Sequence, residues 1–352
     1  MMPSAAPIRV LLLGPFDDAQ HAHTAQRRRA LERLGCEVGT LNLLDRGSIA
    51  DRLWGRGFPR RLERALADTA PDLVLVVGGA GSELTPDLVE SLRKGSPARW
   101  INWLPDDVRT LPQALPLAFA CDKVAAVGTD VVERLASSGL PHSAFLPFAA
   151  DPSIYRPMRS RDQFRANVVF AGVATPRRER LLSELVEFGL AIWGPGWRST
   201  PLRDYCRGEA LGIEDYVRAY NGASVAINIH HTVDGGPGEG ERSLNQRVFE
   251  LAAMGVPQVV DDRGDLARLF TPGQDLVAYR SPGELKTAVA ELLQDRTLAE
   301  RIAESGRRVA LARHTYMHRM LALLELAQLR PPVRTGSAAR ANEAAAAPPD
   351  RA

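Results

Sequence analysis

The sequence has few cysteines, no long apolar run and no recognisable export signal. Its three cysteines, Cys36, Cys121 and Cys206, lie far apart without CxxC or Cys/His spacing, which argues against a disulfide framework or structural zinc. No stretch approaches the roughly 18 uninterrupted apolar residues of a membrane span. The opening "MMPSAAPIRVLLLG" lacks a basic segment, and its apolar run is too short for a signal peptide. We therefore expect a cytoplasmic protein.

Net charge and lysine are also low. A formal charge of +2 over 352 residues is too small to favour nucleic acid as the main partner, so no nucleic-acid partner is predicted. Lysine occurs only at Lys94, Lys123 and Lys286, and all other basic residues are arginine. We interpret this preference for arginine over lysine as the codon bias of a GC-rich, bacterial genome.

What is present is a regular alternation of short apolar runs with helical stretches. Hydrophobic residues make up 45% of the chain and charged residues 24%, values typical of soluble globular proteins, and the length suggests two domains. Strands that alternate with helices predict parallel sheets covered on both faces. The predicted strands are residues 8–13, 38–43, 73–77, 100–103, 124–127 and 143–146 in the first half, and 167–171, 190–193, 225–229, 257–260 and 276–278 in the second.

This pattern predicts an α/β fold with two Rossmann-like, doubly wound parallel-sheet domains that face a cleft. Residues 1–150 form the first domain, and a linker rich in proline and charge follows at 151–166. The second domain covers 167–329, and its last amphipathic stretch, 316–329, is expected to return to the first domain. The Ala/Pro tail at 330–352 is predicted to be disordered. Ligands of such sheets bind beyond the carboxyl ends of the strands.

The stretch "GEGERSLNQRVFELAAMGVPQVVD" (238–261) has the signals of a capped helix. Ser243 and Gln246 fit a capping box, Gly255 fits a C-terminal cap, and Pro257 prevents continuation. We therefore predict a helix at about 244–254. The residues expected on its core face are Leu244, Val248 and Leu251.

The start of this predicted helix suits an anion. A helix N-terminus presents free N–H groups and partial positive charge, and Arg247 adds a charge that pairs well with phosphate. Glu250, three residues on, can accept hydrogen bonds from a diol such as a ribose. The loop before it, 234–241, contains four glycines and can close over a ligand. The alternative is a capped surface helix with an ordinary Arg–Glu pair, and the pattern alone leaves both open.

"SLNQRVFELAAMGVPQVVDD" resembles the N-x-R-x-FE-x3-G motif of the CgeB-like (spore-maturation type) glycosyltransferases, whose catalytic domain belongs to the GT-B class. The other segments similar to that family are "NVVFAGVATPRRERLL" (167–182), "LAIWGPGW" (190–197), "VAINIHH" (225–231) and "RHTYMHRMLALLE" (313–325). The resemblance covers 167–329 well. It is weaker over the first 150 residues, where "INWLPDD" and "LPFAADPSIYRP" match best.

The resemblance implies a glycosyltransferase whose second domain binds a nucleotide-sugar. Gly172 would let the backbone approach the diphosphate, and Arg177 or Arg178 would pair with it. Trp193 and Gly194 would border the nucleoside. Without the resemblance, Trp193 is interpreted as a buried aromatic at the end of a strand.

By the same resemblance, Asn245 and Arg247 would hold the diphosphate or donor sugar, and Glu250 the ribose. Negative charge develops on the departing diphosphate and must be stabilised by a metal, by cationic side chains or by a helix N-terminus. The acidic pairs Asp17-Asp18, Asp106-Asp107 and Asp261-Asp262 lack the spacer of an Asp-x-Asp metal site, so we expect caps or turn residues there. We predict metal-independent transfer without a cofactor, and the resemblance favours retention of stereochemistry.

The acceptor and any base are expected from the first domain. His23 and Asp106 are the candidate catalytic residues, because either can orient an acceptor hydroxyl or act as base in an inverting enzyme. An exposed loop or helix start is the alternative for His23. The acceptor itself stays open among glycan, protein, lipid and small molecule.

A cluster of arginines with two aromatic residues precedes the third predicted strand. Its members are Arg52, Trp54, Arg56, Phe58, Arg60, Arg61 and Arg64. One interpretation is a basic patch that makes weak peripheral contact with anionic lipid or an acidic acceptor. A solvated helix face with a loop is favoured.

Two rival functions remain. One is a non-catalytic protein of the same fold that binds a nucleotide-sugar or sugar. The other is an NAD(P)-dependent oxidoreductase. The end of the first predicted strand, "LLLGPFDD", argues against it, because this segment contains only Gly14 of the GxGxxG fingerprint that binds dinucleotides.

Overall fold

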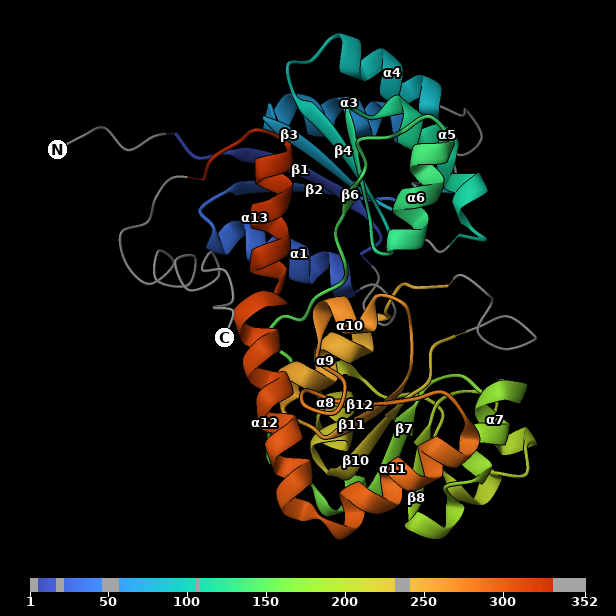
Figure 1. The fold of residues 1–352 in the computed structure, drawn as a ribbon. Coiled ribbons are helices and arrows are strands. Elements are labelled where there is room, and N and C mark those ends of the chain that lie inside the picture. The colour runs from blue at the N-terminus through green and yellow to red at the C-terminus, as the bar shows by residue number, and fades with distance from the viewer. Residues whose placement is uncertain (1–5, 17–21, 46–56, 106–107, 232–240, 332–352) are drawn as a thin grey trace, which may run out of the picture. The chain divides into compact units, whose positions relative to one another are not determined.

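The computed structural model describes residues 6–16, 22–45, 57–105, 108–231 and 241–331 (Figure 1). The chain forms two compact units. Unit 1 contains the chain up to Pro147 together with the part from Tyr316 onward, and unit 2 is Phe148–Thr315. Several predictions fall outside the described residues: Asp106, the acidic pair Asp17-Asp18, most of the glycine loop, the tail beyond 331, and Arg52, Trp54 and Arg56 of the arginine cluster.

Unit 1 is built on a parallel sheet with strand order β2-β1-β3-β4-β5-β6. Its strands are β1 (Arg9–Gly14), β2 (Glu37–Asn42), β3 (Leu73–Val77), β4 (Arg99–Leu104), β5 (Lys123–Ala126) and β6 (Ala144–Phe145). Its helices are α1 (Ala22–Arg33), α3 (Gly57–Thr69), α4 (Pro86–Lys94), α5 (Leu111–Ala120), α6 (Thr129–Ser137) and α13 (Tyr316–Leu326). The central strands are continuous apolar runs because helices cover both of their faces.

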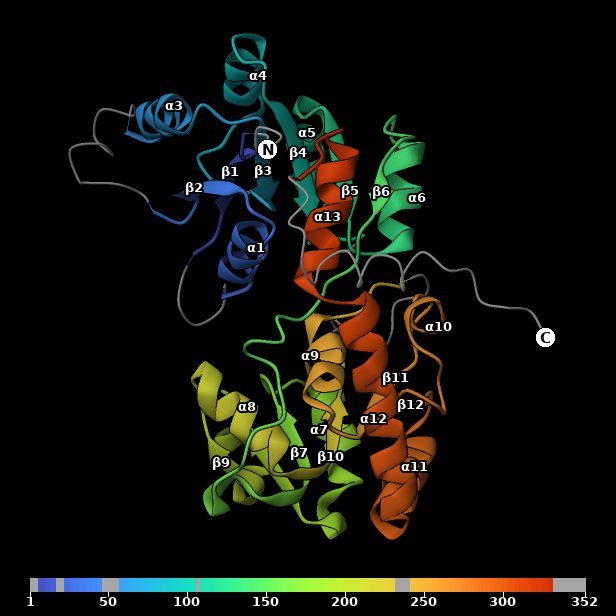
Figure 2. The same cartoon turned by 90° about the vertical axis from the view of Figure 1, so that its left-hand side faces the viewer.

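The last helix, α13, completes unit 1 by packing against α1, the first helix of the chain (Figure 2). Tyr316 on α13 lies edge-on to Trp103 of β4, with ring centroids 6.3 Å apart. The guanidinium carbon of Arg27 on α1 is 4.3 Å from the Trp103 ring centre and 5.0 Å from that of Tyr316. Arg319 donates from Nε to the carbonyl of Pro147 at 2.7 Å. An amphipathic C-terminal helix therefore fills the open side of the first sheet.

Unit 2 is built on a second parallel sheet with strand order β12-β11-β10-β7-β8-β9. Its strands are β7 (Ala166–Ala171), β8 (Leu190–Trp193), β9 (Cys206–Gly208), β10 (Ala223–Asn228), β11 (Gln258–Asp261) and β12 (Val277–Tyr279). Its α-helices are α7 (Pro176–Ser183), α8 (Ile213–Asn221), α9 (Gln246–Met254), α10 (Leu266–Leu269), α11 (Pro282–Gln294) and α12 (Arg296–Arg313), and short 3-10 turns lie at Asp162–Phe164, Val186–Phe188, Trp197–Ser199 and Arg203–Tyr205.

The order of this second sheet places its ligand-binding edge. The chain begins in the middle with β7, runs outward to β9, and then returns to β10 on the other side of β7. This is the doubly wound dinucleotide-binding order, and ligands of such sheets bind at the carboxyl ends of the two strands where the winding reverses. In unit 2 these strands are β7 and β10. Helices α8 and α9 pack on one face of the sheet, and α7 and α11 on the other.

The predicted fold class is confirmed, and each predicted strand matches an observed one to within two residues at either end. Strand β9 was not predicted, because its three residues, Cys206–Gly208, carry no apolar alternation. Phe58 does not belong to a surface patch: it is 1% exposed and lies in the core beneath α3. Its neighbour Arg61 forms an ion pair with Asp45. No helix within the described ranges is both long and apolar enough to cross a bilayer.

Candidate functional site

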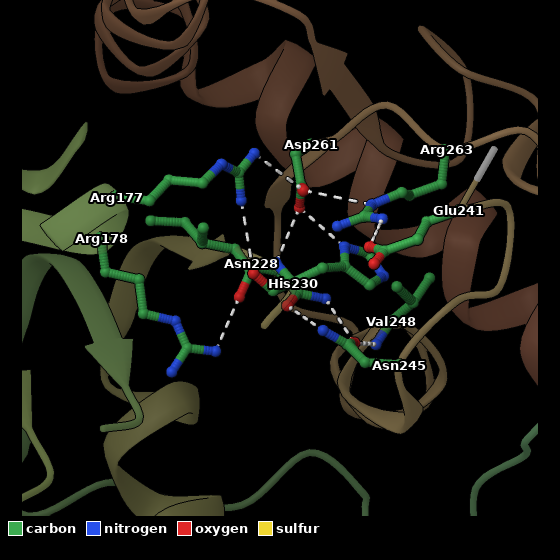
Figure 3. Close-up of polar contacts among 10 residues, drawn as sticks. Arg177, Arg178, Asn228, His230, Glu241, Asn245, Val248, Asp261 and Arg263 are labelled. Carbon is green, nitrogen blue, oxygen red and sulfur yellow. Dashed lines mark hydrogen bonds and ion pairs between the residues drawn. The ribbon is translucent and has the colours of Figure 1, made fainter. Parts of the chain in front are cut away.

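Polar residues gather at the carboxyl ends of β7, β10 and β11 in unit 2 (Figure 3). Asn228 is the last residue of β10, and Asp261 is the last residue of β11. Arg177 and Arg178 reach the same region from the first turn of α7, which Thr175 caps through its side-chain oxygen. Asn245 comes to it from the start of α9. The sheet order thus brings together four segments that are up to 84 residues apart in sequence.

Two glycines let the backbones after β7 and β8 approach closely. A Cβ atom on Gly194 would lie 2.1 Å from the carbonyl oxygen of Gly172, and Gly194 has φ of 139°. The same carbonyl accepts a hydrogen bond of 2.7 Å from Trp197 Nε1. Gly172 itself has φ of 159°, and a Cβ there would press on Phe170 and Arg178. A side chain larger than hydrogen is therefore excluded at Gly194, whereas at Gly172 the side chains of Phe170 and Arg178 would have to shift by a few tenths of an ångström.

Trp193 is buried at the end of β8, next to this crossing. Its ring packs against Phe164 with centroids 6.2 Å apart, and the guanidinium of Arg207 lies 5.6 Å from its centre. The observed packing is that of a buried aromatic at a strand end, and it leaves the residue adjacent to Gly194.

The two arginines at the start of α7 have different partners. Arg177 pairs with Asp261, with 3.1 Å between Nη2 and Oδ2, and donates from Nη1 to the carbonyl of His230 at 3.3 Å. Arg178 is 5% exposed, and its guanidinium donates to the carbonyls of Val173 at 2.9 Å and Ile229 at 3.0 Å. Within the described ranges, no carboxylate forms an ion pair with Arg178.

Arg178 and Arg247 converge on one aromatic ring. Their guanidinium carbons lie 5.3 Å and 5.7 Å from the centre of Phe170, beside Gly172. Burial lowers the pKa of Arg178 to about 10, and the positive charge of Arg247 contributes to the lowering. Arg178 is buried and Arg247 is half-buried. The two cations repel each other, so an anion placed near both would be strongly attracted.

Helix α9 begins later than predicted, and the predicted capping box is wrong. The helix spans Gln246–Met254, and its N-cap is Asn245, whose Oδ1 accepts from the Val248 N–H at 3.3 Å. Asn245 also exchanges two amide hydrogen bonds with Asn228, of 2.9 Å and 3.0 Å. This reciprocal pair fixes the cap to the end of β10, which explains why Asn245 rather than Ser243 holds that position. The predicted core face and the Gly255 cap, with φ of 69°, are confirmed.

Tyr216 of α8 links Arg247 to Glu250. Its hydroxyl donates to Glu250 Oε2 at 2.7 Å and accepts from Arg247 Nε at 3.3 Å. The other carboxylate oxygen, Oε1, accepts from Gln246 Nε2 at 2.9 Å. Burial, and then the nearby charge of Glu250, raise the pKa of Tyr216 well above its usual value, so the hydroxyl keeps its proton. Gln246 therefore holds Glu250 instead of closing a capping box.

Asp261 is the centre of a buried charge network. Its Oδ1 accepts from both the backbone N–H and the ring Nδ1 of His230, at 2.9 Å and 2.7 Å. Its Oδ2 faces Arg177 and, at 3.4 Å, Arg263, which pairs in turn with Glu241 at 2.7 Å. Burial alone would raise the pKa of Asp261, but His230 and the two arginines outweigh it and hold that pKa well below its usual value. Burial lowers the pKa of His230 despite the attraction of Asp261.

Asp261 was expected to be a cap or turn residue, and this expectation is wrong. The residue ends a buried strand and balances two arginines, whereas its neighbour Asp262 pairs with exposed Arg280 at 2.8 Å. A pocket of about 760 Å³ opens beside the network, between α7 and the ends of β11 and β12, and both Arg177 and Asp261 line it. Across the described part of the chain, no three His, Cys, Asp or Glu side chains group to hold a metal ion.

The two candidate catalytic residues belong to unit 1. His23 is half-buried in the first turn of α1, after the end of β1. Asp106 lies outside the described residues. Sequence reasoning did not assign roles to Tyr216 or His230. The segment "VAINIHH" contained His230, but nothing in it pointed to Asp261, which is 31 residues away.

Comparison with known proteins shows which families and folds this chain is similar to. Residues 177–325 match the family model described as "Glycosyl transferase-like". The spore protein CgeB of Bacillus subtilis (strain 168) is 20% identical over 234 residues, which cover 62% of this chain and 71% of CgeB. The resemblance to CgeB-like proteins is therefore confirmed.

Several solved structures share the fold. Sucrose-phosphate synthase from Thermosynechococcus elongatus aligns with a TM-score of 0.66 and 13% identity, over 91% of this chain and 98% of the synthase. A glycosyltransferase from Rickettsia africae aligns with a TM-score of 0.64 and 11% identity, over 92% of this chain and 98% of that structure. HepE from Anabaena, solved in complex with UDP and glucose, aligns with a TM-score of 0.60 and 12% identity, over 91% of this chain and 99% of HepE. The chain has the GT-B glycosyltransferase fold, and with the family match it is a glycosyltransferase of that type.

Proposed function

We propose that unit 2 binds a nucleoside-diphosphate sugar and that the enzyme transfers the sugar to an acceptor without a metal ion. The observation that carries this proposal is the convergence of Arg178 and Arg247 on Phe170, beside Gly172. These residues lie at the strand ends where the winding of the sheet reverses, which is where this class of sheet binds its ligands.

The reaction needs positive charge at the leaving group. As the bond between the anomeric carbon and the diphosphate breaks, its electron pair stays on the phosphate oxygen, and preorganised cations stabilise it. Arg178 has no carboxylate partner within the described ranges, and it is held by two carbonyls. The first turn of α9, capped by Asn245, adds backbone N–H groups. Cationic side chains thus supply the charge that a metal ion supplies in other transferases.

The structure distinguishes two arginines that the sequence left equivalent. Arg177 is paired with Asp261 at 3.1 Å, so we assign the diphosphate contact to Arg178. Gly172, which would let the backbone approach the diphosphate at the end of β7, lies beside Arg178, and Asn245 caps the start of α9.

The nucleoside portion would extend toward β8 and α9. Glu250 accepts one hydrogen bond on each oxygen, and a carboxylate has further lone pairs for a ribose diol. Trp193 and Gly194 would border the base from the end of β8. The complexes of HepE with UDP and with UDP-glucose support a donor of this class.

For the acceptor side, His23 and Asp106 remain the candidate residues, as groups that orient or deprotonate an acceptor hydroxyl. The acceptor class stays open among glycan, protein, lipid and small molecule.

Thermal shift with UDP, GDP, TDP, their sugars and NAD(P) tests the donor assignment. A nucleoside diphosphate at about 100 times its Kd should stabilise the protein by roughly 2.7 kcal/mol. Because a hydrogen bond to a charged group contributes about 1.5–3 kcal/mol, Arg178→Ala and Arg247→Ala should each weaken binding about 10- to 150-fold. Arg203→Ala is the matched control, since Arg203 is exposed and its side chain pairs with Asp204 alone among the described residues. Stabilisation by NAD(P) alone, or equal binding by all three variants, would refute the proposal.

A transfer or hydrolysis assay with the sugar nucleotide that binds then tests catalysis. Turnover should persist in excess EDTA, because arginines rather than a metal neutralise the leaving group. Loss of turnover in EDTA that added Mg²⁺ or Mn²⁺ restores would contradict metal independence. Tight binding with neither transfer nor hydrolysis would favour a non-catalytic binding protein.

A further inference from the structure

The histidine in the Asp261 network, His230, has one ring nitrogen that no group in the described part of the chain hydrogen-bonds. His230 Nδ1 is 2.7 Å from Asp261 Oδ1, and an ionised carboxylate only accepts, so Nδ1 carries the proton. The other nitrogen, Nε2, is buried and has no hydrogen-bond partner among the described residues. The side chain is 5% exposed. A neutral imidazole therefore places a hydrogen-bond acceptor without a donor inside the candidate site. Burying such an atom is unfavourable in free energy unless a ligand forms a hydrogen bond with it.

His230 also belongs to the segment that both arginines of α7 contact. Arg178 donates to the carbonyl of Ile229, and Arg177 to the carbonyl of His230 itself. Asn228, two residues earlier, is paired with the cap of α9. Figure 3 shows His230 among Arg177, Arg178 and the Asn228–Asn245 pair.

The charges around the imidazole come from three elements. Asp261 of β11 faces it directly and attracts a proton, whereas Arg177 of α7 and Arg263 after β11 repel one. Glu241 is engaged with Arg263 on the far side of that arginine. A bound diphosphate brings at least two negative charges to this region. It would offset both arginines and reverse the balance that keeps His230 neutral.

We propose that His230 takes up one proton when the diphosphate of the donor binds, and that Nε2–H then donates a hydrogen bond to a phosphate oxygen. This inference rests on the proposed function. The proton comes from solvent, and the Nδ1–H bond to Asp261 is kept, so the imidazolium is held between two acceptors. When the glycosidic bond breaks, the electron pair remains on the diphosphate, where the new N–H stabilises it. His230 then acts as a positively charged ligand only while a donor is present.

Isothermal titration calorimetry with UDP near pH 6 tests this, in buffers of different ionisation enthalpy. The slope of binding enthalpy against buffer enthalpy gives the protons taken up per UDP bound. His230→Asn is the informative variant, because its amide can still donate to Asp261 but lacks the second ring nitrogen. His142→Asn is the control, since His142 is an exposed histidine of unit 1. UDP has a phosphate pKa near 6 and can itself lose a proton, so variants are compared with wild type rather than with zero.

We expect wild type and His142→Asn to take up close to one proton more than His230→Asn. We also expect the affinity of wild type for UDP to fall several-fold between about pH 6 and pH 8, more steeply than that of His230→Asn. Equal slopes in all three proteins would overturn the inference. Where His230→Asn fails to fold or bind, the ¹⁵N shifts of the wild-type imidazole decide, and a neutral ring in the UDP-saturated protein overturns it. If wild type binds UDP with no change at His230, the proposed function stands and this inference falls. If it binds no nucleoside diphosphate, both fall.

Discussion

The backbone crossing at Gly194 and Gly172 makes a quantitative prediction about stability. In Gly194→Ala, the new Cβ would lie 2.1 Å from the Gly172 oxygen and 2.6 Å from its carbonyl carbon, and real Cβ atoms stay about 3 Å or more from such atoms. Both obstacles are backbone atoms, so no side-chain rotation relieves the contact. The strand ends must move apart by about 1 Å.

Two costs add up. Alanine at φ of 139° is strained by about 1–3 kcal/mol. Separation of the strand ends weakens the hydrogen bonds from Gly172 N to Trp193 O and from Gly194 N to Gly208 O, both 2.8 Å, and a lost buried bond costs about 1–3 kcal/mol. We expect a total of roughly 3–5 kcal/mol, which for a domain of this size lowers the melting temperature by roughly 6–20 °C.

Urea unfolding followed by tryptophan fluorescence measures this loss, and one of the five tryptophans, Trp197, donates from Nε1 to the Gly172 carbonyl itself. Gly283→Ala is the matched control: a Cβ there meets nothing within 4 Å. Since Gly283 lies in α11, alanine should leave stability unchanged or raise it by up to about 1 kcal/mol. A loss below about 1 kcal/mol in Gly194→Ala, or equal losses in both variants, would show that the crossing is not rigid.

Three further substitutions probe buried polar groups. Arg27→Met should leave the free energy of unfolding unchanged or raise it by about 1–4 kcal/mol, because burial lowers the pKa of this arginine and no carboxylate within the described ranges pairs with it. Urea unfolding measures this free energy, and a decrease as large as that of Arg27→Ala would contradict the prediction. Tyr216→Phe removes the hydroxyl that donates to Glu250. It should lower the free energy of unfolding by about 1–3 kcal/mol and weaken UDP binding. If neither quantity changes, Tyr216 does not link Arg247 to Glu250 as described. Stability should fall as the pH drops below about 6.5, since burial keeps the folded pKa of His230 below its unfolded value and the unfolded chain takes up the proton first. Urea titrations from pH 8 to 5 should show that the free energy of unfolding falls less in His230→Asn than in wild type, and as much in His142→Asn as in wild type. Identical profiles in all three proteins would rule out His230 as the source of the fall.

The strand pattern was readable from sequence because each central strand is buried on both faces and must be a continuous apolar run. Residues 73–77 and 190–193 were predicted with their observed bounds for this reason. Strand β9 was missed because it lies at the sheet edge and is only partly buried, so its composition carries no such constraint.

The site was only partly readable, because local rules gave more than one answer. Ser243 and Asn245 both suit an N-cap, and the choice is made by Asn228, a contact 17 residues away. Asp261 looked like a turn residue because its two arginines and its histidine come from other elements. Arg247 and Glu250 were recognisable from their helix, but the tyrosine that joins them comes from α8.

The closure of unit 1 by α13 has a consequence for how the protein is made. Unit 2 is one continuous segment, Phe148–Thr315, so it can fold as soon as that segment has left the ribosome. Unit 1 is synthesised first but lacks the partner of α1 and Trp103 until Tyr316–Leu326 has emerged. Domains usually fold in order of synthesis, and here we expect unit 2 to finish folding before unit 1. A message truncated just after unit 2 would yield a finished second unit attached to a first unit whose apolar side stays exposed.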